Sequence, residues 1–156
     1  MHGPGVKSAG RSVKAILCAI IDDHSRMVVG HGFQTSETIS ALTMVLKEAF
    51  LTHGICKRLY VDNGASFSSD LLARSCALAS ISLIHSKPYD SPSRGKVERF
   101  FRTVRDRILP AIQENLTLDE INASFRLWLR NDYHHKIHTG INPEGCDPQT
   151  FQNRAR

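Results

Sequence analysis

The spacing of apolar positions changes along the chain and predicts a succession of strands and helices. Two β-capable runs come first, over 13–21 and 27–33, with a polar turn between them. The second run contains two glycines, which predicts a weak or bulged strand. Two further short strands are predicted over 58–61 and 81–84. Residues 1–12 are rich in Gly, Ser and basic side chains, and we expect a loop or the end of a hairpin there.

Four segments are predicted to be helices, and three of them have a start or stop signal. We expect them after an N-cap at Thr35 or Ser36 up to Gly54, over 71–78, over 96–109 before Pro110, and from the capping box of Thr117 and Glu120 onward. The proline-containing segment 87–95 is predicted to be a loop, and the chain from Tyr133 onward irregular. Strands that alternate with helices after an antiparallel opening predict an α/β fold with a mixed sheet.

Composition supports one globular domain and excludes several classes. The chain has 156 residues, of which 41% are hydrophobic and 22% charged, so it can bury a core. Its four cysteines form no Cys-x-x-Cys unit, which argues against a disulfide framework and favours the cytoplasm. The longest apolar run, 15–21, is too short to span a bilayer. The net charge of +5 fits either a solvated surface or a polyanionic partner.

The helix predicted over 96–109 separates an apolar stripe from a charged face. The stripe comprises Val97, Phe100, Phe101, Val104 and Ile108. Glu98, Arg102 and Arg105 follow at i, i+4 and i+7 and share a neighbouring face, where a carboxylate could meet a metal and arginines could meet phosphates. Taken alone, this pattern favours a simple surface ion pair of Glu98 with Arg102. Arg94, Lys96 and Arg99 add positive charge at the helix start, where the macrodipole disfavours it.

Asp62 follows the strand predicted over 58–61 and precedes Asn63-Gly64. An Asp-Asn-Gly sequence is a turn signature that needs no catalytic explanation. However, ligands of open α/β sheets bind at the carboxyl ends of strands, and Asp62 stands at such an end. Asp62 is therefore a candidate catalytic carboxylate.

Segments 60–67 and 88–101 together resemble the integrase catalytic core of retroviral integrases and bacterial insertion-sequence transposases. The 35 residues between Asp62 and Glu98 match the Asp, Asp-35-Glu pattern of that family. Further similarity lies in 20–26, which resembles the end of the family's second strand, and in 133–143, which resembles the tract that closes its core.

The resemblance implies a ribonuclease-H-like fold, a mixed sheet flanked by helices, with a catalytic core over 1–143 and a polar tail over 144–156. It implies that three carboxylates hold two Mg²⁺ or Mn²⁺ ions, with Asp62 as the second and Glu98 as the third. The expected partner is DNA, as transposon ends and target, and the parent protein is expected to form a homo-oligomer near the bacterial nucleoid. The basic residues expected to contact DNA are Arg94, Lys96, Arg99, Arg102 and Arg105.

The first of the three carboxylates has no counterpart in the sequence. Alignment of the hairpin places it just before Met1, so we expect the first strand to be largely missing and this chain to be inactive in strand transfer, unlike its intact parent. Asp22 and Asp23 follow the second strand, and we interpret them as turn residues rather than as metal ligands.

Two other functions stay open: a non-catalytic DNA-binding or oligomerisation fragment, and a ribonuclease-H-like nuclease that hydrolyses without joining. A zinc site of His134, His138 and Cys146 is disfavoured, because no second cysteine accompanies Cys146 and the surroundings are rich in Pro and Gly.

Overall fold

The computed structural model describes residues 1–8, 11–62, 64, 69–86, 91–112 and 116–136, with the backbone alone over 91–94. Its strands are β1 (His2–Ser8), β2 (Arg11–Ile21), β3 (Val28–Gln34), β4 (Arg58–Val61) and β5 (Ser82–His85). Its helices are α1 (Ile39–His53), α2 (Asp70–Leu78), α3 (Ser91–Arg107) and α4 (Leu118–Asn131), with the 3-10 turns η1 (Leu109–Ala111) and η2 (Tyr133–His135). No described helix is both long and apolar enough to cross a membrane.

The predicted order of strands and helices is confirmed, but several local predictions are wrong. The N-cap of α1 is Thr38 and not Thr35 or Ser36. The chain from Tyr133 onward begins with the 3-10 turn η2 and is not irregular there.

The segment 1–12 contains strand β1, because pairing with β2 and burial of Val6 outweigh its glycine content. Helix α3 begins at Ser91 rather than at Lys96, since Pro92 lies in the first turn, where a proline removes no helical hydrogen bond. The capping box of Thr117 and Glu120 is present as predicted.

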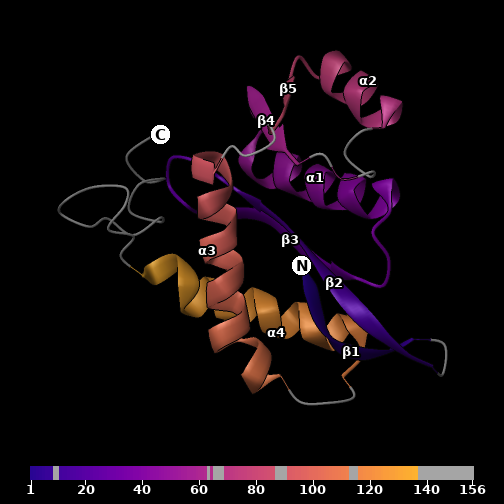
Figure 1. The fold of residues 1–156 in the computed structure, drawn as a ribbon, viewed down its shortest axis with the longest axis vertical. Helices are drawn as coiled ribbons and strands as arrows, with labels where there is room; N and C mark the ends of the chain where they lie inside the picture. Colours follow the sequence, from indigo (N-terminus) through magenta and orange to yellow (C-terminus); the bar gives the residue numbers. More distant parts are fainter. Residues whose placement is uncertain (9–10, 63, 65–68, 87–90, 113–115, 137–156) are drawn as a thin grey trace.

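The strands form two separate sheets (Figure 1). In the first, β1, β2 and β3 are antiparallel neighbours in that order. In the second, β4 pairs with β5 in parallel. The expectation that the first strand is largely missing is wrong, because seven of its residues form β1. Met1 extends the pairing with β2 by two hydrogen bonds with Leu17, of 2.8 and 3.0 Å. Beyond Leu17, β2 pairs only with β3 among the described residues, with a register shift between Ile20 and Ile21.

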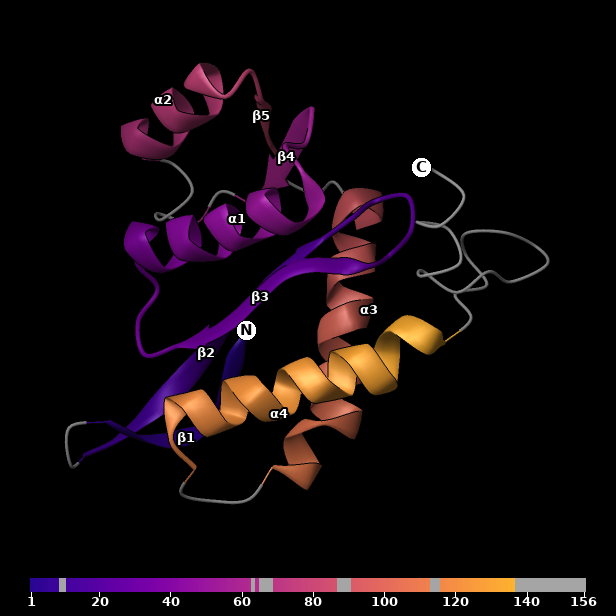
Figure 2. The ribbon, with the colours of Figure 1, turned by 180° about the vertical axis from the view of Figure 1, so that it is seen from behind.

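Helices cover both faces of the three-stranded sheet, α3 and α4 on one and α1 on the other (Figures 1 and 2). The first core lies under α3 and α4, and its fully buried side chains include Leu17, Phe33, Phe100 and Phe125. The second core lies between α1, α2 and the β4–β5 sheet, with contributions from Cys18 and Ile20 of β2. Gly30 of β3 lets α1 approach closely, because a Cβ there would lie 3.0 Å from the Cβ of Ala49.

The outer edge of β3 is closed by side chains from α4 and η2. The Asn122 side chain accepts from the Phe33 amide at 2.7 Å and donates to the Phe33 carbonyl at 3.0 Å, so it replaces a neighbouring strand at that residue. Further along, the Val28 amide donates to Nε2 of His134 at 3.2 Å. Because unpaired backbone groups are costly when buried, these contacts hold α4 and η2 against the sheet.

Replacing Asn122 by alanine should destabilise the fold by about 1–3 kcal/mol, since the Phe33 backbone would lose both partners in a partly buried place. Urea denaturation measures the change. Asn131→Ala, at an exposed position near the end of the same helix, is the matched control and should change stability by less than about 0.5 kcal/mol. Equal effects of the two substitutions would contradict the assigned role of Asn122.

Candidate active site

Asp62 lies directly after β4, with an exposed side chain. Its Oδ1 accepts a hydrogen bond from the Gly64 amide at 2.9 Å. This contact between an aspartate side chain and the amide two residues later is an Asx-turn. The predicted turn is therefore formed, and it fixes the carboxylate at the carboxyl end of the strand. This place is compatible with both the turn and the catalytic interpretation.

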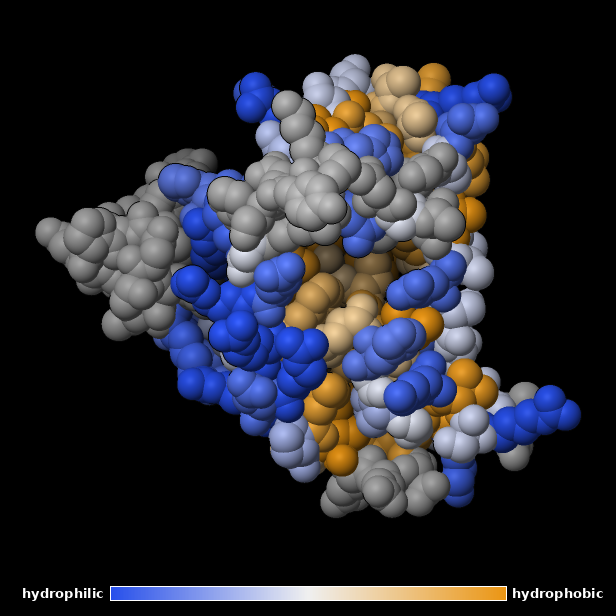
Figure 3. Space-filling view, viewed as in Figure 1, coloured by the Kyte–Doolittle hydropathy of each residue, from blue (hydrophilic) through white to orange (hydrophobic). Residues whose placement is uncertain are grey.

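Charged groups from four parts of the chain surround the beginning of β1. Burial lowers the pKa of the Met1 amino group; the charges of Glu37 and Asp62 oppose this lowering, and that of Arg105 adds to it. Asp62 and Arg105 therefore lie within electrostatic reach of one point, although they belong to β4 and α3. The face of the molecule in Figure 3 is hollowed here, between the polar surface of α3 and the strands below α1.

Glu37 is a further charged residue that acts on the beginning of β1, and the sequence pattern does not indicate it. It precedes the N-cap of α1, Thr38, by one position. The sequence carries no signal that this connection between β3 and α1 reaches the beginning of β1. Only the fold brings them together.

Helix α3 presents the predicted charged face to solvent. Phe100, Val104 and Ile108 are buried in the first core, whereas Val97 is 36% exposed and does not belong to the buried stripe. Glu98, Arg102 and Arg105 are exposed, and within the described chain Glu98 forms no ion pair with Arg102. The surface pair that was the simpler explanation for these residues is therefore not formed. Seven residues of helix place Glu98 about 10 Å from Arg105 along the axis.

The remaining basic residues of α3 differ in their surroundings. Lys96 lies 2.5 Å from Oδ1 of Asp23, so its ammonium is engaged with the turn between β2 and β3. Arg99 is exposed. The side chain of Arg94 lies outside the described part of the structure. The pair of Lys96 with Asp23 is itself half-exposed, and such pairs exchange partners at little cost.

Asp22 and Asp23 serve the turn after β2, as predicted. Oδ2 of Asp22 accepts from both the amide and the hydroxyl of Ser25, each at 2.7 Å. Arg26 adopts a left-handed conformation with φ of 62° and bonds to the Asp23 carbonyl. Neither carboxylate is needed as a metal ligand to explain its position.

The donor set at the candidate site suits a hard divalent cation. Asp62 and Glu98 are exposed carboxylates, and Mg²⁺ typically binds one or two carboxylates together with water and substrate phosphates. Within the described residues no group of three or more His, Cys, Asp or Glu side chains could hold a metal. A zinc site is not supported either, since Nε2 of His134 accepts from the Val28 amide, while His138 and Cys146 lie outside the described residues.

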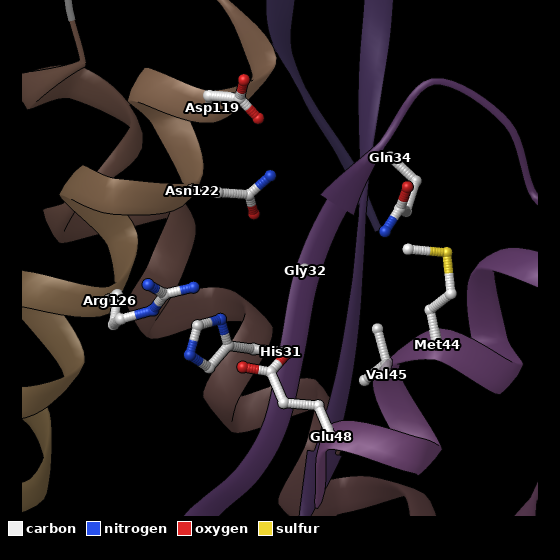
Figure 4. Close-up of a pocket in the computed structure, with 9 residues that line it drawn as sticks. All are labelled: His31, Gly32, Gln34, Met44, Val45, Glu48, Asp119, Asn122 and Arg126. Atoms are coloured by element: carbon white, nitrogen blue, oxygen red, sulfur yellow. The ribbon is translucent and has the colours of Figure 1, made fainter.

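A pocket of about 240 Å³ lies elsewhere, between α1, β3 and α4 (Figure 4). Its charged and polar lining includes His31, Gln34, Glu48, Asp119 and Arg126. Burial lowers the pKa of His31, and its Nδ1 has no hydrogen-bond partner among the described residues. The pocket contains neither Asp62 nor Glu98, so it is separate from the candidate catalytic residues.

Solved structures with this fold include retroviral integrase cores. The catalytic core domain of BIV integrase is 20% identical, with a TM-score of 0.69 over 91% of this chain and 88% of that one. The HTLV-2 integrase catalytic core domain, solved in complex with magnesium in a trimeric form, is 21% identical, with a TM-score of 0.64 over 96% of this chain and 89% of that one. These likenesses confirm the predicted ribonuclease-H-like α/β fold.

Sequence comparison leads to transposases. The transposase of transposon Tn552 from Staphylococcus aureus is 28% identical over an alignment of 144 residues, and the match covers 80% of this chain. The chain spans only 30% of the length of that relative. The TnsB C-terminal domain family matches residues 31–113, more than half of the chain, and this range includes both Asp62 and Glu98. The chain therefore belongs to the TnsB C-terminal domain family.

Proposed function

We propose that this chain supplies the catalytic core of a DNA transposase, and that the intact parent protein transfers DNA strands by attack on a phosphodiester. The observation that carries the proposal is the convergence at the beginning of β1. There the carboxylate of Asp62 and the guanidinium of Arg105 act on one point from β4 and α3. Metal-assisted phosphoryl chemistry uses carboxylates that hold the metal, and guanidinium groups bind phosphate. Family membership and the similarity to the Tn552 transposase support the same reaction class.

Asp62 and Glu98 are the residues that would hold divalent metal in this proposal. Asp62 is fixed by its turn with Gly64, and Glu98 by the burial of Phe100 and Val104 on the other side of α3. When bound, Mg²⁺ or Mn²⁺ supplies the charge that stabilises the entering and leaving oxygens. The chain itself contributes these two acids, and we expect it to be inactive in strand transfer without a third.

The arginines of α3 bind DNA phosphates. Arg99, Arg102 and Arg105 are exposed and extend along more than one turn of the helix, so they can follow a phosphate backbone. Lys96 can join them by exchanging Asp23 for a phosphate, and Arg94 stands two positions before Lys96 in the same helix. In the parent protein this surface holds transposon ends and target DNA, in a homo-oligomer associated with the nucleoid.

Asp62→Asn and Glu98→Gln should each reduce joining of a labelled DNA end by at least about a thousandfold, because loss of a metal ligand costs several kcal/mol in the transition state. The assay uses the longest protein that the gene encodes, with Mg²⁺ or Mn²⁺. DNA retention should stay unchanged in both variants.

Asp106→Asn changes an exposed carboxylate on the same helix as Glu98 and is the matched control. Joining that survives in either site variant would remove that residue from the active site. Cleavage without joined product would favour a hydrolytic nuclease. DNA retention with no cleavage or joining in the unmodified protein would favour a binding fragment.

Arg102→Gln and Arg105→Gln should each weaken DNA binding and lower the slope of log K against log salt by about 0.7–0.9, since each arginine releases about one counterion from DNA. Fluorescence anisotropy at several salt concentrations measures this slope. Arg130→Gln, an exposed change on α4, should leave the slope unaltered. A slope that Arg105→Gln does not alter would place the DNA away from this face of α3.

A further inference from the structure

One face of the β4–β5 sheet is exposed although its other face is buried. Leu59 and Leu83 point from the paired strands into the second core, toward α1 and α2. Side chains alternate between the two faces of a strand, so Arg58, Tyr60 and Ile84 lie on the opposite face. No residue of β4 or β5 belongs to the core beneath α3 and α4.

Tyr60 dominates this open face. Its side chain is 59% exposed and lies opposite Ile84 in the strand pairing, next to the exposed Arg58 on the same face. Neither Arg58 nor Tyr60 has a side-chain hydrogen bond or ion pair with the described residues. An exposed tyrosine beside an unpaired arginine resembles the composition of a recognition surface more than that of an ordinary solvated one.

The open face continues into the candidate active site. Asp62 directly follows β4 and stands two positions after Tyr60, so the two residues are about 7 Å apart along the chain. This distance corresponds to about two base steps of DNA. A nucleotide resting on Tyr60 would therefore be a near neighbour of a phosphodiester positioned at Asp62.

We propose that Tyr60 stacks on an unpaired base of the DNA strand beside the reacting phosphodiester, while Arg58 contacts the adjacent phosphate. The inference rests on the proposed function and adds a positioning residue to it. An aromatic ring offers a flat surface to any base, so this contact holds the strand without reading its sequence. The positive charge of Arg58 and the continuity with Asp62 favour DNA over a protein partner.

The test uses the full chain, a short duplex with a single-stranded overhang, and 2-aminopurine within that overhang. EDTA is present, so quenching of the probe reports stacking without any chemistry. Tyr60→Ala should abolish the quenching and weaken binding about 5- to 150-fold, whereas Tyr60→Phe should keep both within about twofold, because the ring is retained. Leu71→Ala removes a side chain of α2 that is also 59% exposed, and should change neither.

Unchanged quenching in Tyr60→Ala, or no quenching by the unmodified chain, overturns the proposal. So does a change of oligomeric state in Tyr60→Ala with quenching intact, which would make the face a protein interface. The two proposals fail separately: a lack of metal-dependent cleavage and joining in the longest protein that the gene encodes refutes the proposed function, while unaltered quenching refutes only the base contact.

Discussion

Two-sided burial of strand β2 is the constraint on which the rest of the structure depends. Leu17 enters the core under α3 and α4, whereas Cys18 and Ile20 enter the core under α1. A shift of one residue in the pairing would exchange these faces and place both sets of side chains in the wrong core. The register of β2 therefore decides where α3 lies, and with it the position of Glu98, Arg102 and Arg105 relative to Asp62.

Much of this fold can be predicted from the sequence, because the local sequence signals agree with the burial of the side chains. Periodicity or capping predicts three features that the folded chain contains: the apolar stripe of α3, the capping box before α4 and the short strand β4. Strand β1 is different. Its glycines favour a loop, and it is extended only because it pairs with β2. A local sequence pattern does not show this pairing.

The candidate site can be predicted from the sequence only in part. The spacing of Asp62 and Glu98 identifies the two acids through resemblance to a family, and periodicity identifies the arginine face. The neighbourhood of Glu37 and the exposure of Tyr60 depend on how distant segments meet, which no single segment encodes. Lys96 shows the same limit, because its pairing with Asp23 joins residues 73 positions apart.

The closure of β3 by Asn122 and His134 also bears on self-association. An open strand edge is a template for aggregation through strand addition, and here one outer edge of the three-stranded sheet is occupied by side chains. The opposite edge belongs to β1, which carries Pro4 and Lys7, residues that discourage pairing with another chain. Both outer edges of the three-stranded sheet are thereby protected against cross-β polymerisation.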